Sequence, residues 1–136
     1  MIPRPHQALV DLAGRIGGRI LPELTDPYAI ADTGMVTMLL GMLAKELESG
    51  VARRLEDGQE LATLFADANH APGAEARAAF AASRPASLTL TDVNAWLDSG
   101  LELVIELQAW AEREDPTLLD AIWAWLARHT ERHRFD

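Results

Sequence analysis

The chain has 136 residues, 49% of them hydrophobic, and its 21 acidic against 12 basic side chains give a net charge of −9. This length suits a single domain with its own core, and the acidic balance excludes the basic face with which nucleic-acid-binding proteins contact phosphates. The lack of cysteine excludes disulfide frameworks, thiol catalysis and thiolate metal sites. We therefore expect one acidic domain over residues 1–136 that binds no nucleic acid.

The N-terminal sequence does not have the basic and then apolar layout of a signal peptide, because two prolines and Asp11 interrupt it. The longest uncharged apolar run covers residues 33–44, which is too short to cross a bilayer. We expect a cytoplasmic protein without a membrane segment.

Apolar residues at helical spacing predict a first helix over residues 6–21, which Pro22 ends. Its glycines, Gly14, Gly17 and Gly18, fit neither a P-loop nor a dinucleotide fingerprint, since no Lys-Ser/Thr pair follows them and no strand precedes them. We expect these small residues to let the helix approach a neighbour closely.

The most apolar stretch follows, over residues 25–47. Asp26 and Pro27 are typical of the cap and first turn of a helix. One face of this helix is apolar, so we expect it to be buried; it holds Tyr28, Ala31, Met35, Met38, Leu39 and Met42, with Glu46 near its middle. The helical pattern continues to about residue 68, but one helix of that length would exceed the dimensions of a compact chain. We therefore expect a break at the glycines of 49–50 or 57–58.

Residues 69–73 are a predicted loop, 74–82 a short alanine-rich helix and 83–87 a further connection. This part of the chain offers little apolar area to offset its ordering entropy. We expect residues 69–88 to form a mobile connection, with a lid as the alternative.

Two helices end the chain. Thr89 and Asp92 have capping-box spacing at the start of a helix over 91–114, and Asp115 with Pro116 begins another over 116–133. Apolar residues in the first of them recur at intervals near 3.5, which is typical of helical bundles. The predicted fold is an all-α, antiparallel, up-and-down-like bundle of five to six helices, four of them long (6–21, 27–49, 91–114 and 116–133).

Glu46 raises the first chemical question, because burying a carboxylate costs several kcal/mol unless it has a partner. An ion pair at the end of the bundle is the structural interpretation, and a polar centre in an apolar ligand pocket is the functional one. The pocket candidates are Tyr28, Met35, Met38, Met42 and Glu46.

His129 and His133 raise the second question, because two histidines at i and i+4 have a known zinc-ligand spacing. However, no glutamate follows His129, as a metalloprotease helix would require, and cationic side chains are also favourable near a helix C-terminus. We expect no metal or cofactor, and regard His129 and His133 as weak candidate ligands.

The helix over 91–114 is apolar around more than a third of its circumference, which is more than one neighbour covers. The candidate interface residues are Trp96, Leu103, Trp110, Trp123 and Trp125. The sequence favours a non-enzymatic module that forms a homo-oligomer, such as a homodimer, or binds a protein partner. The alternatives are a small-molecule binder or enzyme with a pocket around Met38, Met42 and Glu46, and a metal-dependent hydrolase or oxidase that uses His129 and His133.

Overall fold

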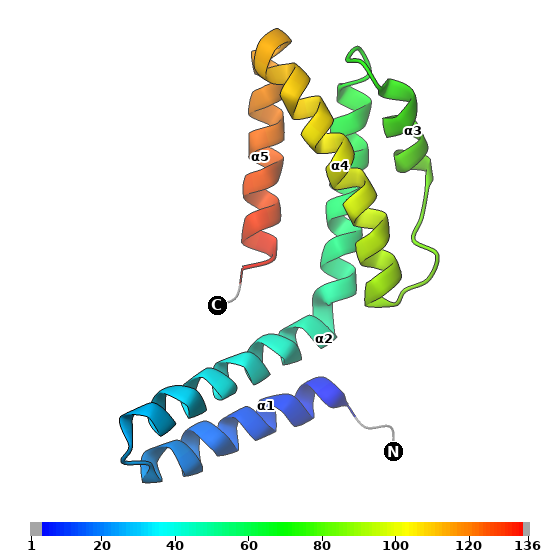
Figure 1. The fold of residues 1–136 in the computed structure, drawn as a ribbon. Helices are drawn as coiled ribbons and strands as arrows, with labels where there is room; N and C mark the ends of the chain where they lie inside the picture. The colour runs from blue at the N-terminus through cyan, green and yellow to red at the C-terminus, as the bar shows by residue number, and fades with distance from the viewer. Residues whose placement is uncertain (1–3, 135–136) are drawn as a thin grey trace. The chain divides into compact units, whose positions relative to one another are not determined.

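The computed structural model describes residues 4–134, and all regular structure in this range is helical. Its α-helices, drawn in Figure 1, are α1 (Pro5–Arg15), α2 (Pro27–Asp67), α3 (Ala74–Ala82), α4 (Leu90–Glu114) and α5 (Pro116–Arg132). A π-helix, η1 (Ile16–Ile20), and a 3-10 turn, η2 (Leu21–Glu23), follow α1. The all-helical prediction is confirmed, and the described residues form five α-helices.

Contacts within the chain define two units, Met1–Gly50 and Val51–Asp136, where we expected one domain. The boundary falls inside α2, which contributes to both units. The expected helix break was wrong, because α2 continues through Gly50 and Gly58 to Asp67. A glycine inside a helix costs only about 1 kcal/mol, which packing and neighbouring helical hydrogen bonds offset.

Three helix starts follow the predicted caps. The side chain of Asp26 accepts a hydrogen bond from the Ala29 N–H at 2.9 Å. Thr89 Oγ1 accepts from the Asp92 N–H at 3.3 Å and Asp115 Oδ1 from the Leu118 N–H at 3.0 Å. Each oxygen satisfies a backbone donor that has no partner within its own helix. The starts of α2, α4 and α5 were therefore predictable from local sequence.

The first unit is a hairpin of α1, with η1 and η2, against the N-terminal part of α2 (Figure 1). A Cβ atom at Gly17 would lie 3.3 Å from Thr37 Cγ2, so the close approach expected of the glycines occurs at Gly17. Near the open end of the hairpin, His6 Nε2 lies 3.9 Å from Glu48 Oε1. The two helices thus contact each other along the side of α2 that carries Thr37.

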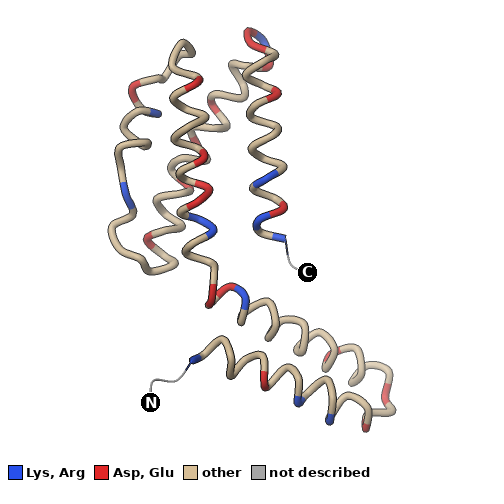
Figure 2. Tube along the Cα trace, turned by 180° about the vertical axis from the view of Figure 1, so that it is seen from behind, with Lys and Arg blue, Asp and Glu red and all other residues tan. Residues whose placement is uncertain are grey.

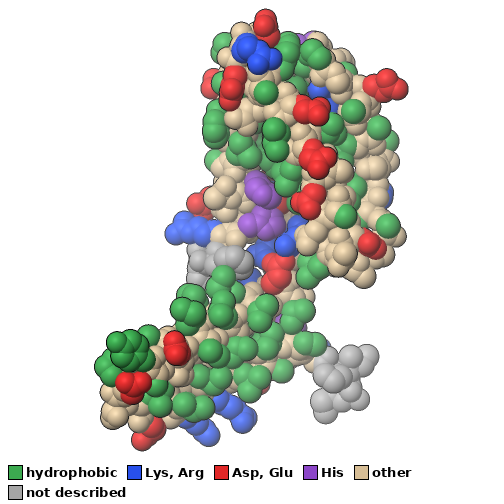
Figure 3. Space-filling view, in the orientation of Figure 1, with side chains coloured by type: hydrophobic (Ala, Val, Ile, Leu, Met, Phe, Trp, Pro, Cys, Tyr) green, Lys and Arg blue, Asp and Glu red, His purple; other side chains and the backbone are tan. Residues whose placement is uncertain are grey.

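The apolar side of α2 expected to be buried is instead exposed. Tyr28 is 82% exposed and Met38 58%. We call this surface the exposed apolar face; it comprises Tyr28, Met35, Val36, Met38, Leu39, Leu43 and Leu47. In Figure 3, hydrophobic side chains cover much of the visible surface of this hairpin. The expectation failed because, among the described residues of this unit, α2 has only α1, η1 and η2 beside it, and Gly17 of η1 meets α2 on the side that carries Thr37.

The second unit contains the hydrophobic core. The predicted apolar seam of α4 is confirmed, since it is buried throughout: Val93, Leu97, Gly100, Val104, Leu107 and Ala111. Leu61 and Phe65 of α2, Phe80 of α3, and Ile122 and Trp125 of α5 complete the main part of this core. Asp115 alone joins α4 to α5, and these two helices lie side by side in opposite directions (Figure 1).

Candidate functional site

A buried carboxylate lies between α2 and α5 in the second unit. Asp57 is 0% exposed. One of its oxygens, Oδ2, lies 2.9 Å from His129 Nδ1 and 2.5 Å from His133 Nε2. The other, Oδ1, accepts a hydrogen bond from Arg132 Nη1. Three side chains of α5 therefore converge on one carboxylate of α2.

Helical spacing explains both sides of this cluster. His129, Arg132 and His133 stand at i, i+3 and i+4, so they share one face of α5. Asp57 precedes Leu61 and Leu64 by four and seven residues, and all three side chains are buried on the core-facing side of α2. The carboxylate thus occupies a core position, where only charged or hydrogen-bonding partners make it tolerable.

Further ion pairs surround the cluster. Arg132 Nη2 donates to Glu60 Oε1 at 2.7 Å, and its Nε lies 3.2 Å from Glu56 Oε2. Arg128 Nε lies 3.3 Å from Glu60 Oε2. Arg132 therefore pairs with Glu56 and Glu60 in addition to Asp57, whereas Arg128 pairs with Glu60.

These contacts determine the protonation of the buried acid. Burial raises the pKa of Asp57, but hydrogen bonds from His129, His133 and Arg132 outweigh it and hold that pKa below the ordinary value. Burial lowers the pKa of Arg132, yet Glu60 and Asp57 together raise it above the ordinary value. At neutral pH Asp57 is therefore a carboxylate beside the guanidinium cation of Arg132.

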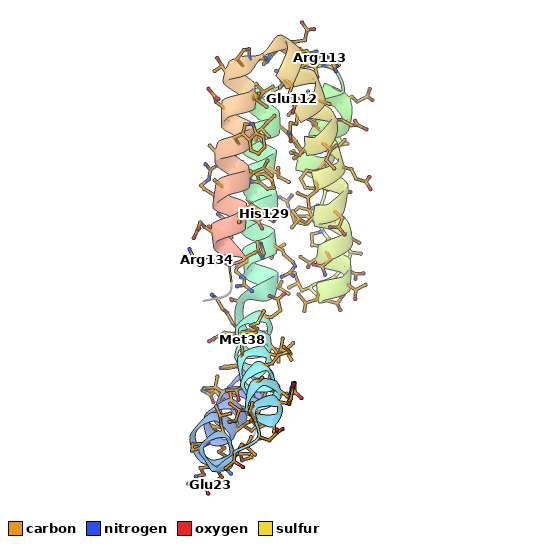
Figure 4. All side chains as sticks on the ribbon, turned by 60° about the vertical axis from the view of Figure 1, so that its left-hand side comes forward. Glu23, Met38, Glu112, Arg113, His129 and Arg134 are labelled. Carbon is orange, nitrogen blue, oxygen red and sulfur yellow. The ribbon has the colours of Figure 1, made fainter. Side chains whose placement is uncertain are left out.

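The imidazoles are held in place but remain accessible. The ring of His129 stacks on Trp125 at 5.1 Å between centroids and 17° between planes. The rings of His129 and His133 lie 4.8 Å apart. Both histidines are partly exposed, and Figure 3 shows histidine side chains at the surface of the second unit. Figure 4 shows His129 on the side of α5 that faces α2. The cluster therefore has a buried acidic end and a solvent-facing end.

The pocket candidates of the sequence analysis all belong to the first unit. Tyr28, Met35 and Met38 are exposed, while Met42 and Glu46 are half-buried. The Glu46 carboxylate lies over Gly50 of its own helix, because a Cβ at Gly50 would stand 2.6 Å from Glu46 Oε1. The Glu46 side chain thus packs along α2, and the ion pair that the structural interpretation expects for it stays a prediction.

The interface candidates all belong to the second unit. Trp125 is buried in its core, and Trp96, Leu103 and Trp110 pack against that core. Trp123 is exposed. Four of these five side chains therefore take part in packing within the chain itself.

The sequence analysis identified His129 and His133 but missed Asp57, their common partner, because the pair Asp57-Gly58 was interpreted as a helix end. The helical spacing of Asp57 with Leu61 and Leu64 was the signal that could have placed it on the core side. The contact of Asp57 with α5 could not be predicted in this way, because no local sequence pattern indicates which helices pack together.

No family model, curated protein or solved structure matches this chain.

Proposed function

We propose that the protein is a non-enzymatic, self-associating module whose first unit completes its core against the same unit of a second copy. The observation that carries this proposal is the exposed apolar face of α2, on which Met35, Met38, Leu39 and Leu43 are about half exposed or more. Contiguous exposed apolar surface of this kind is typical of interaction sites.

A second copy is the partner that fits this hairpin best. Two helices bury one side of each other, and two hairpins together bury the remaining apolar sides as a four-helix bundle. Closed dimers with two-fold symmetry are also the commonest assemblies of identical chains. The antiparallel bundle expected from the sequence would then form between two chains.

The charge pattern supports a protein partner. Figure 2 shows a long stretch without charged residues in the N-terminal half of α2, and the sequence places it at residues 33–44. By length and composition α2 could also cross a membrane, and only 6% of its apolar window is buried within the chain. One such helix near the N-terminus is weak evidence for a membrane span. The other helix of the hairpin carries exposed Asp11 and Arg15, followed by Arg19 in η1, and a lipid environment would penalise these charges.

The proposal assigns the former pocket candidates to the interface. Met38 lies on the exposed apolar face, and Met42 and Glu46 lie beside it on α2. Methionine adapts to irregular apolar partners, so these residues suit a helix-on-helix contact.

Light scattering after size-exclusion chromatography tests the proposal. The wild-type chain of 14.9 kDa is expected to elute with twice this mass. Leu39→Glu places a carboxylate in the exposed apolar face and is expected to give the single-chain mass. The matched control is Ile105→Glu, which makes the same kind of change at a 67% exposed residue of the second unit and is expected to leave the dimer intact.

Two results would contradict the proposal. One is a wild-type chain that stays monomeric at about 100 μM, a concentration at which a standard-size interface is well populated. The other is a dimer that dissociates in Ile105→Glu and persists in Leu39→Glu, since the interface would then lie on the second unit.

A further inference from the structure

We propose that Asp57, His129 and His133 form a binding site for a divalent transition-metal ion, with Zn²⁺ as the best-fitting ion. One ligand atom from each residue, a carboxylate oxygen or a ring nitrogen, lies within 4.8 Å of the other two. Two imidazoles and one carboxylate are a recurrent ligand set for such ions.

The ligand atoms already converge. His129 Nδ1 and His133 Nε2 both point at Asp57 Oδ2, at 2.9 and 2.5 Å. Around a tetrahedral zinc ion with bonds of about 2.0–2.1 Å, neighbouring ligand atoms stand roughly 3.3 Å apart. The two distances to Asp57 Oδ2 would therefore have to lengthen by less than about 1 Å to open the space for the ion.

The surrounding residues hold the ligands in orientation. Trp125 stacks on His129 and fixes its ring plane. Arg132 donates a hydrogen bond to Oδ1 of Asp57, so that Oδ2 is the oxygen that would coordinate the ion. Such outer contacts are a regular feature of metal sites, because they orient the ligands.

The charges of the neighbouring side chains permit a cation here. The guanidinium groups of Arg128 and Arg132 would repel it, but Glu56 and Glu60 pair with them. Asp57 then supplies one negative charge to the ion. Mg²⁺ and Ca²⁺ prefer ligand sets made entirely of oxygen, so the two imidazoles favour Zn²⁺. The partial exposure of His129 and His133 leaves a fourth position open to water.

The test is a titration of the full, tag-free chain with Zn²⁺ alone against a competing chromophoric chelator, with native mass spectrometry for stoichiometry. We expect one zinc ion per chain. His129→Gln and His133→Gln keep a hydrogen-bond donor for Asp57 but replace the metal ligand, and each is expected to weaken zinc affinity at least tenfold. Asp57→Asn is expected to do the same, provided that circular dichroism shows native helix content.

The matched control is His70→Gln. His70 also pairs with an aspartate, since its Nε2 lies 2.8 Å from Asp115 Oδ2, but it is not part of the three-ligand cluster. Wild-type zinc affinity is expected in this variant. Co²⁺ supplies a second readout, because its visible absorption reports the coordination shell and is expected to change in His133→Gln.

The proposal is overturned if the wild type takes up no zinc, or if the His129 and His133 variants bind as tightly as the wild type. Equal loss of affinity in His70→Gln would also overturn it, because zinc would then bind through scattered surface histidines.

Discussion

Arg77 binds the backbone at the start of the segment 69–88, for which mobility stays a prediction. It is only 3% exposed. Its guanidinium donates to the backbone oxygens of Ala68 at 2.8 Å, Ala71 at 2.9 Å and Pro72 at 2.6 Å. Carbonyls at the end of a helix lack partners within that helix, and Arg77 supplies partners for the end of α2 and the loop after it. Burial lowers the pKa of Arg77, and Glu106 opposes that shift.

Arg77→Ala is therefore expected to lower the free energy of unfolding by about 2–4 kcal/mol, because it removes three hydrogen bonds from a charged donor to backbone oxygens. Urea denaturation followed by circular dichroism measures this change. Arg113→Ala, at an exposed arginine of α4, is the control and is expected to stay within about 0.5 kcal/mol of the wild type. Equal stability of the two variants would show that Arg77 does not hold the loop.

Asp115 gives a prediction of pH dependence. Its hydrogen bond from the Leu118 N–H, followed by that with His70, holds the pKa of Asp115 below the ordinary value of 3.8. The folded chain therefore binds fewer protons at this residue than the unfolded chain does. The resulting stability is present above the unfolded pKa and is lost as the pH falls through the folded pKa.

We expect this loss to begin below about pH 5. Asp115→Asn keeps a capping oxygen but does not titrate, so its unfolding free energy should fall less steeply over the same acid range. Parallel urea titrations of both proteins from pH 6 to pH 3 measure the difference. Parallel curves for the two proteins would mean that Asp115 contributes nothing to acid sensitivity.

At the scale of elements, the packing of α2 on α4 depends on a close approach at Gly58. A Cβ atom at this position would overlap the six-membered ring of Trp96. Trp96 in turn stacks on Phe80 at 5.2 Å and donates from Nε1 to Ser83 Oγ at 2.8 Å. We expected Gly58 to be a place where a helix could end, whereas it lies inside α2 and makes room for a tryptophan.

Gly58→Ala is expected to destabilise the protein by about 2 kcal/mol, because overpacking outweighs the gain in helix propensity. Trp96→Phe shortens the ring and carries its own cost through the lost hydrogen bond to Ser83. In the double variant the loss should be about 1 kcal/mol smaller than the sum of the two single losses, since the smaller ring accommodates the new methyl group. Thermal and urea unfolding of all four proteins test this; strict additivity would show that the two residues do not meet.

The seam of α4 shows what was predictable at this scale. Its six buried positions followed from spacing alone, because a helix with one apolar stripe buries that stripe. The same reasoning failed for α2, where the apolar stripe between Tyr28 and Leu43 is exposed. The spacing of apolar residues predicts which side of a helix packs against another element. It does not indicate whether that element belongs to the same chain.

At the scale of the whole molecule, the two units differ in how their apolar residues are covered. The second unit has its own core and the cluster around Asp57. The first unit has no buried side chain among its large apolar residues in the described part of the chain. The first unit therefore offers apolar surface for self-association, as proposed, and the second offers the ligands of the proposed metal site.

The sequence by itself determined the helical class, the caps at Asp26, Thr89 and Asp115, and the buried stripe of α4, because these depend on contacts within a few residues. Only the tertiary structure decided that α2 continues through Gly50 and Gly58, that four of the five candidate interface side chains pack within the second unit, and that Asp57 meets His129 and His133. These outcomes depend on which helices lie together. Residues more than 70 positions apart, such as Asp57 and His129, are joined by packing that no local pattern specifies.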